Sequence, residues 1–127
     1  MVISHLTGGL GNQLFQYAAA KSLSLHHGVK LHLDISSFSR DKLPELELPR
    51  NFELYAFSGV TESILDKKKI DELFPLSKEK TLLQKILPRY RRDVYKQPYF
   101  HFDRNFFRSK KQVYLKGGWQ SEKYFSQ

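Results

Sequence analysis

Three glycines within four residues stand where an apolar strand meets a helix, and this turn is the part of the chain best suited to bind a ligand. Gly8, Gly9 and Gly11 follow a β-branched segment at residues 2–6 and surround the start of a helical pattern at Asn12. Glycine lets a ligand approach the backbone, and the first amides of a helix lack internal partners and carry partial positive charge. The turn therefore suits an anionic or polyhydroxylated ligand.

The turn matches part of the G-x-G-x-x-G pattern that binds dinucleotides. Gly9 and Gly11 fit its first two positions, and Asp34 supplies an acidic residue about 20 positions later. Leu14 occupies the third position, where close packing of helix on strand normally requires glycine. An NAD-type site is thus one interpretation, and Leu14 argues against it.

Single residues near the turn each have a structural and a functional interpretation. Asn12 is a good helix N-cap and also a candidate to bind a sugar. Gln13 and Gln16 fit the surface of the helix, and Gln13 is the better ligand candidate because it is nearer the turn. Asp34 either caps the end of its strand or contacts substrate. Trp119 either packs beneath the segment that follows it or stacks on a sugar.

The elements around the turn predict a parallel α/β sheet. Residues 2–6 and 29–34 form strands on either side of a helix at 13–27, which Gly28 ends. Two strands joined by a helix of this length favour parallel pairing with a right-handed crossover. Ligands bind at the carboxyl ends of such strands, so the glycine turn and Asp34 should share one edge.

The rest of the chain is expected to continue this pattern less regularly. The segment after residue 98 is rich in aromatic residues and alternates poorly, which favours an irregular structure. The expected elements are helices at 61–74 and 78–87, an irregular segment at 99–107, a strand at 113–115, a turn at Gly117 and Gly118, and a helix beginning near Ser121.

Two groups of motifs lie near the two ends of the chain. They comprise residues 8–18 (GGLGNQLFQYA), 21–23, 33–34, 44–48 (PELEL), 99–103 (YFHFD) and 114–125 (YLKGGWQSEKYF). In sequence and in order, these stretches closely resemble the bacterial α-1,2-fucosyltransferases of glycosyltransferase family 11. Residues 58–96 match nothing specific.

The resemblance implies the amino-terminal half of a GT-B type enzyme that transfers fucose from GDP-fucose to a galactose hydroxyl of an acceptor glycan. It also implies that Gly8, Gly9, Gly11, Asn12, Gln13 and Asp34 line the substrate side, with Asn12 close to the reaction centre. The family's H-x-R-R-x-D motif, thought to hold the donor diphosphate, does not occur in residues 1–127. The chain is therefore expected to be an incomplete amino-terminal domain whose nucleotide-binding domain is missing, and the general base is unassigned.

The sequence predicts no metal site and no cofactor beyond the sugar nucleotide. There is no cysteine and no Asp-x-Asp in the 127 residues, and none of the five histidines has metal-like spacing with a carboxylate. His5 lies in a strand, where a buried, hydrogen-bonded histidine is the usual structural role.

No apolar run approaches the length of a membrane span, and the start of the chain lacks the basic region of a signal peptide. We expect a cytoplasmic protein.

The net charge of +8 implies an anionic partner. A sugar nucleotide, the anionic inner face of a membrane and a nucleic acid are the three candidates, and the last lacks any recognisable binding module. Much of the excess charge lies between Lys67 and Lys96, and Lys67–Lys69 should fill the solvent face of the helix at 61–74. A non-enzymatic basic binding module remains an alternative to an enzyme.

Because the diphosphate motif is absent from residues 1–127, we predict that this chain alone transfers no fucose from GDP-fucose to any galactoside. The measurement is release of GDP and formation of fucosylated product by the purified 127-residue chain. Turnover by the chain alone would show that the diphosphate site lies within it.

Overall fold

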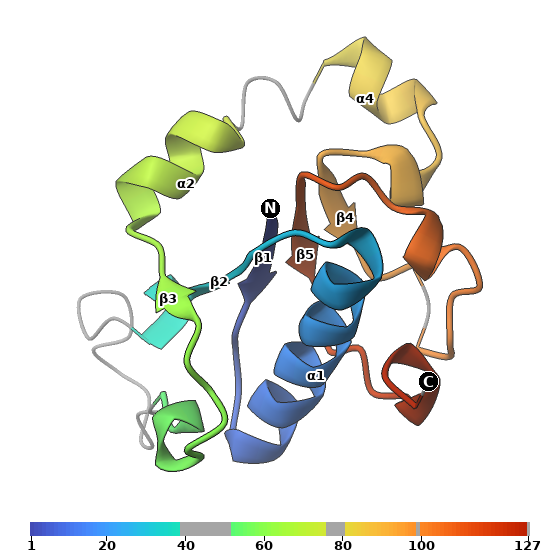
Figure 1. Cartoon of the computed structure of the whole chain (residues 1–127). Coiled ribbons are helices and arrows are strands. Elements are labelled where there is room, and N and C mark those ends of the chain that lie inside the picture. The colour runs from blue at the N-terminus through green and yellow to red at the C-terminus, as the bar shows by residue number, and fades with distance from the viewer. Residues whose placement is uncertain (39–51, 76–80, 99, 127) are drawn as a thin grey trace.

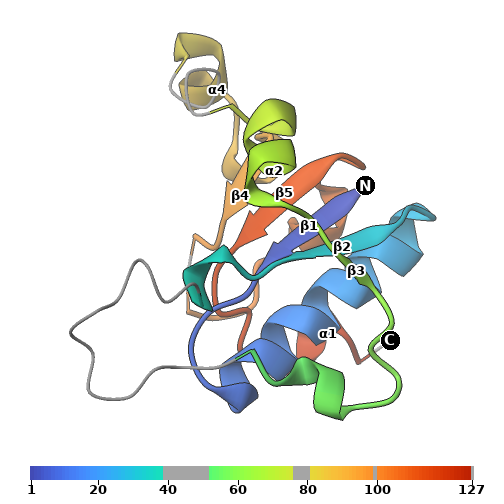
Figure 2. The same cartoon turned by 90° about the vertical axis from the view of Figure 1, so that its left-hand side faces the viewer.

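In the computed structural model, which describes residues 1–38, 52–75, 81–98 and 100–126, one parallel sheet carries helices on both faces (Figures 1 and 2). The described strands lie in the order β3-β2-β1-β5-β4, and all neighbours are parallel. This order confirms the α/β, Rossmann-like fold expected from the sequence. The strands are β1 (Val2–His5), β2 (Leu31–Asp34), β3 (Ser63–Ile64), β4 (Val94–Lys96) and β5 (Val113–Lys116).

The first three elements form the predicted βαβ unit. Helix α1 (Leu10–His27) joins β1 to β2 and ends with Gly28 as its C-cap. Its inner residues Ala19, Ala20 and Leu23 are fully buried in the cluster that covers one face of the sheet. These apolar positions recur at helical spacing, and their burial fixes α1 against β1 and β2.

The opposite face of the sheet is covered by the short helix α2 (Lys67–Leu73). Ile70 of this helix and the following Phe74 pack with Ile3 of β1, Val94 of β4 and Tyr114 of β5. Lys67, Lys68 and Lys69 are exposed, which confirms that the lysine run fills the solvent face of the helix. No helix among the described residues is long and apolar enough to cross a bilayer.

The helix predicted at 61–74 is wrong in its first half. Ser63 and Ile64 form β3 and pair with His32 and Leu33 of β2, so the helix begins only after Asp66. The Asp66 side chain caps it by accepting a hydrogen bond from the Lys68 amide. Strand pairing at the sheet edge and an Asp cap outweighed the apolar spacing from which the longer helix was inferred.

The other middle elements are shorter than expected. Helix α4 (Leu82–Ile86) starts after the cap Thr81 and ends before Pro88. Residues 78–80, the start of the helix predicted at 78–87, lie outside the described residues. Residues 44–48 and Tyr99, which belong to the motifs of the sequence analysis, also lie outside them. Strand β4 was not predicted, because three residues are too few to show a period. Within the described residues, 3₁₀ turns lie at Ser36–Phe38, Leu54–Ala56, Arg89–Arg91, Phe106–Arg108 and Glu122–Tyr124.

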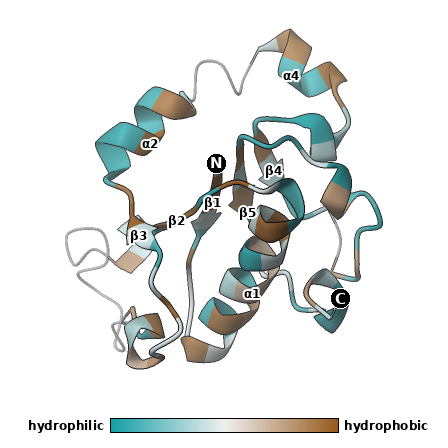
Figure 3. Ribbon diagram, in the orientation of Figure 1, coloured by the Kyte–Doolittle hydropathy of each residue, from teal (hydrophilic) through white to brown (hydrophobic). Residues whose placement is uncertain are grey.

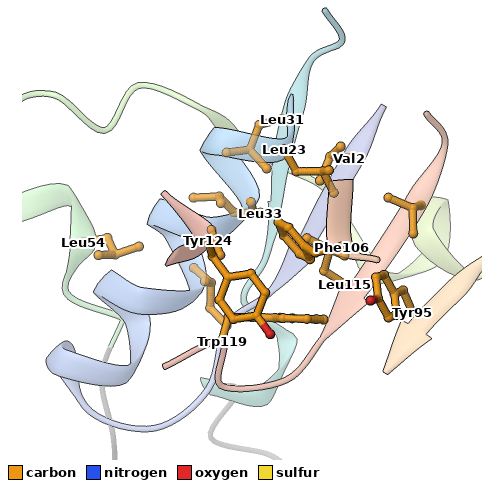
Figure 4. Packing of buried hydrophobic residues seen from close by; sticks show 14 of the residues in the cluster. Val2, Leu23, Leu31, Leu33, Leu54, Tyr95, Phe106, Leu115, Trp119 and Tyr124 are labelled. Atoms are coloured by element: carbon orange, nitrogen blue, oxygen red, sulfur yellow. The ribbon is translucent and has the colours of Figure 1, made fainter. Parts of the chain in front are cut away.

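Buried aromatic side chains pack in the hydrophobic cluster between α1 and the sheet (Figure 4). Tyr124 is fully buried, with its ring centroid 4.7 Å from that of Phe106 and 5.3 Å from that of Trp119. Trp119 is 1% exposed, so it packs in the core, and the alternative of stacking on a sugar is wrong. Phe106 packs against the rings of both Trp119 and Tyr124, and Tyr95 packs against Trp119.

Candidate functional site

The glycine turn occupies the carboxyl end of β1, as predicted, but the helix starts earlier than the sequence suggested. Its N-cap is Gly9, and the first helical bond runs from the Gln13 amide to the Gly9 carbonyl, 3.0 Å away. Asn12 therefore lies inside the first turn of α1, and its prediction as the N-cap is wrong. Glycine has a low helix propensity, so the sequence pattern did not predict that the helix begins at Leu10.

Asn12 packs its side chain over Gly8. Gly8 has a φ of +76°, and a Cβ added there would lie 2.6 Å from the Asn12 amide nitrogen. Only glycine fits this combination of a left-handed backbone and close contact. Gly11 differs, because a Cβ there would meet nothing within 4 Å. The backbone at Gly11 thus faces open space.

Two buried glutamines hold the turn in shape. The Gln13 amide donates to the Gly8 carbonyl at 3.0 Å and accepts from the Glu53 amide at 3.1 Å. The Gln16 side chain accepts from the Thr7 amide at 2.9 Å and donates to the Thr7 hydroxyl at 3.1 Å. Both are 2% exposed or less, so their expected position on the helix surface is wrong. Their spacing of three residues puts them on one helix face, which is the signal that could have identified the pair.

The turn meets the second motif-bearing segment of the chain through Asn12. The Gln120 side-chain amide donates to Asn12 Oδ1 at 2.6 Å, across 108 residues of sequence, and both residues are exposed. We call the surface formed by Gly8, Gly9, Gly11, Asn12 and Gln120 the glycine-turn surface. It joins the two ends of the chain into one candidate site.

The segment that carries Gln120 is itself fixed by a glutamine. Gln97 accepts hydrogen bonds from the amides of Gly118 and Trp119, at 2.9 and 3.1 Å. A Cβ at Gly117 would lie 2.5 Å from Gln97 Cβ, so a larger residue there would push the two segments apart. Gln97 directly follows β4 and was not singled out in the sequence, because its role depends on the pairing of β4 with β5.

A polar cluster at the same edge of the sheet joins three strands. Tyr114 of β5 donates to Asp34 Oδ2 at 2.5 Å, and its hydroxyl lies 2.8 Å from His5 Nδ1. His5 Nδ1 is 3.3 Å from the same carboxylate oxygen, and His5 and Asp34 are register partners in β1 and β2. The Ser36 amide donates to Asp34 Oδ1 at 2.9 Å, so Asp34 also caps its strand as one interpretation expected.

These contacts fix the charge of Asp34. Burial alone would raise the pKa of its carboxyl group, but hydrogen bonds from His5, Tyr114 and Ser36 outweigh burial and hold the pKa well below its usual range. An ionised carboxylate only accepts hydrogen bonds, so the His5 nitrogen facing it is the one that carries hydrogen. In the neutral imidazole, Nε2 then carries no hydrogen. His5 is 19% exposed, so solvent reaches part of its side chain.

A hollow lies beside the second segment. It has a volume of about 530 Å³ and is lined by residues 101–105 and Lys123. Asp103, one of its lining residues, is buried and accepts a hydrogen bond from Tyr95, while its amide donates to the Tyr124 hydroxyl at 2.9 Å. Arg104 and Lys123 give the rim positive charge. Among the described residues, no three His, Asp or Glu side chains gather as a metal site.

The fold and this site define a Rossmann-like domain with a glycine turn and a polar cluster at the carboxyl edge of a parallel sheet. The chain is 31% identical, over 137 aligned residues, to alpha-1,2-colitosyltransferase of Escherichia coli, a glycosyltransferase. The alignment takes in 98% of this chain and 41% of that enzyme, so the chain spans about two fifths of the length of this relative. No protein-family model matches the chain, and no solved structure gives a significant match.

The Asp34 cluster generates a prediction about stability. Asp34→Asn should lower the free energy of unfolding by about 2 kcal/mol at pH 7, because it weakens charge-assisted hydrogen bonds to a buried carboxylate. A carboxyl whose pKa is lower in the folded state contributes its full stability above the unfolded value of about 4, and that contribution is lost as the pH falls further. The difference between wild type and variant should therefore shrink below about pH 4.

Denaturant titrations between pH 7 and pH 3 measure this difference. Asp71→Asn, which changes an exposed carboxylate on α2, is the matched control and should alter stability by less than about 0.5 kcal/mol throughout. A wild-type-to-variant difference that is the same at pH 7 and pH 3 would contradict the assigned ionisation of Asp34.

Proposed function

We propose that this chain forms the amino-terminal α/β part of a GT-B type glycosyltransferase. We further propose that the enzyme transfers fucose from GDP-fucose to a hydroxyl of a galactose-containing glycan, in an α-1,2 linkage, during the synthesis of surface glycans. The observation that carries the proposal is the hydrogen bond between Asn12 and Gln120. It brings together the two motifs that resemble fucosyltransferases, and the similarity to the colitosyltransferase supports sugar transfer independently.

The glycine-turn surface suits the acceptor glycan. Gly11 leaves open space above the backbone, and the first turn of α1 contains no acidic residue that would repel an anionic ligand. Asn12 and Gln120 are exposed amides, each with donor and acceptor groups for sugar hydroxyls. Gln13 and Asp34 would act behind this surface, as positioning residues, because their side chains are buried and engaged with neighbouring groups.

Transfer to a hydroxyl requires a group that accepts its proton. We assign this role to His5, whose Nδ1 is held by Asp34 and Tyr114 so that Nε2 is the basic nitrogen. The diphosphate of the donor needs cationic or amide partners to stabilise its developing charge. In this proposal those partners lie mostly in a second domain, and no metal ion or other cofactor takes part.

The colitosyltransferase relative provides a second candidate for the donor. Its name specifies an α-1,2 linkage and a colitosyl group, so a colitosyl donor should be tested beside GDP-fucose. The complete gene product would be incubated with each donor and a β-galactoside, and the linkage of the product determined by NMR. Transfer from neither donor, or binding of NAD at the glycine turn, would overturn the proposal.

We predict that Asn12→Ala and Gln120→Ala in the complete gene product each lower kcat/KM about a hundredfold, which is about 2.7 kcal/mol of transition-state binding. Both residues are exposed, so loss of their mutual hydrogen bond should change stability by only about 1 kcal/mol. Steady-state kinetics and thermal melting separate the two effects.

Gln112→Ala is the matched control for Gln120→Ala. Gln112 is an exposed glutamine that precedes β5, whereas Gln120 follows it. The control should keep wild-type kinetics. If both Asn12→Ala and Gln120→Ala also keep wild-type kinetics, the glycine-turn surface is a structural contact and the proposal fails at this site.

The assignment of His5 predicts that His5→Ala lowers kcat by about a hundredfold or more, as loss of a general base does. Added imidazole should restore part of the rate, which a purely structural defect would not allow. His26→Ala, which removes an exposed histidine from the last turn of α1, is the control for imidazole effects. If imidazole restores nothing although His5→Ala melts like wild type, His5 is not the proton acceptor.

A further inference from the structure

Helix α4 buries a polar residue and exposes its apolar residues. A surface helix normally buries its apolar face and exposes its polar one. In α4 the buried residue is Gln84, whereas Leu82, Leu83 and Ile86 are 74%, 68% and 70% exposed. Figure 3 shows hydrophobic (brown) and hydrophilic (teal) residues side by side in this helix.

Polar contacts hold α4 in this orientation. Gln84 accepts a hydrogen bond from the Asp93 amide at 3.1 Å and donates to its carboxylate at 3.5 Å. The Arg92 guanidinium donates to the carbonyls of Leu87 and Lys85, at 2.9 and 3.0 Å, and thereby satisfies the end of the helix. The helix is thus fastened to the start of β4 by its polar side, and its apolar side is left facing outward.

Exposed cations lie in α4 and in the 3₁₀ turn that follows it. Lys85, Arg89 and Arg91 are exposed, and we call them, together with Leu82, Leu83 and Ile86, the α4 patch. Asp93 is the sole acidic residue in the described segment 81–98, and it is paired with Lys110. A surface that combines exposed apolar side chains with nearby cations complements an anionic lipid surface, and its charge repels a second copy of the same surface.

We propose that the α4 patch docks the protein on an anionic phospholipid membrane. Leu82, Leu83 and Ile86 enter the boundary between headgroups and acyl chains, and the cations contact the phosphates. Figures 1 and 2 place α4 and the glycine turn at opposite ends of the molecule. Docking through α4 therefore leaves the carboxyl edge of the sheet facing the solution, and this proposal does not depend on which sugar is transferred.

Sedimentation with vesicles tests the proposal on the complete gene product. Vesicles of phosphatidylglycerol and phosphatidylcholine should bind the protein, with affinity that falls as salt rises, and vesicles of phosphatidylcholine alone should bind it far less. Leu83→Asn and Ile86→Asn should each weaken binding about tenfold, since each removes an aliphatic side chain from the lipid. Arg89→Gln should weaken it about fivefold.

Matched controls come from exposed residues elsewhere. Leu25→Asn changes a leucine on α1 that is 70% exposed, and Lys30→Gln changes an exposed lysine before β2, so both should bind vesicles like wild type. All variants should melt within a few degrees of wild type, because the altered side chains contribute little to the core. Equal loss of binding in the control and patch variants would overturn the proposal.

Two further outcomes would also overturn it. If wild type ignores anionic vesicles, no membrane docks at α4. If the patch variants instead change the molecular mass in solution, as measured by sedimentation equilibrium, the patch is a contact between protein chains.

Discussion

Parallel pairing of β5 with β1 brings the two motif-bearing segments of the chain together. Val2, Ile3 and Ser4 pair in register with Val113, Tyr114 and Leu115. Because both strands point the same way, the glycine turn after β1 and the Gly117 segment after β5 emerge at the same edge of the sheet. The same pairing carries Tyr114 to Asp34 and His5, so the polar cluster and the glycine-turn surface depend on one strand register.

Within this frame, the side-chain amides of three glutamines, two of them buried, set the shape of the loops. Gln13, Gln16 and Gln97 each accept hydrogen bonds from loop amides, and Gln13 and Gln16 also donate to loop oxygens. A buried amide left without partners costs about 1–3 kcal/mol, so the loop positions that satisfy these glutamines are strongly favoured over others. The exposed pair Asn12 and Gln120 sits on top of these fixed loops. The site is therefore preorganised by residues that need not touch a ligand.

The sequence was sufficient to predict the parallel βαβ unit, because β1, α1 and β2 have clear periods and Gly28 ends the helix. It also identified Asp34 and the glycine turn as neighbours at one edge. It did not predict that Asn12 lies inside the helix, because the helix begins among glycines. It also did not predict that Gln13 and Gln16 are buried, because polar residues of a helix usually face the solvent. Propensity scales describe an isolated helix and carry no information about a loop that folds back onto it.

Longer-range features could not be predicted for a different reason. Strand β3 consists of two residues and exists because β2 offers an edge to pair with. The clustering of His5 with Tyr114, and the contact of Asn12 with Gln120, each join residues more than a hundred positions apart. Helix α4 showed an ordinary apolar pattern in the sequence. Its outward orientation depends on Asp93 and Arg92, whose role appears only in the folded chain.

Hydrogen–deuterium exchange would examine the proposed substrate surface directly. The complete gene product would be compared with and without a β-galactoside, and separately with NAD, by following peptides that cover residues 7–12 and 117–122. If these two segments form one acceptor surface, the galactoside should slow exchange in both peptides together, and NAD should leave both unchanged. Protection by NAD, or no protection by the galactoside at concentrations that saturate turnover, would contradict the account given for this site.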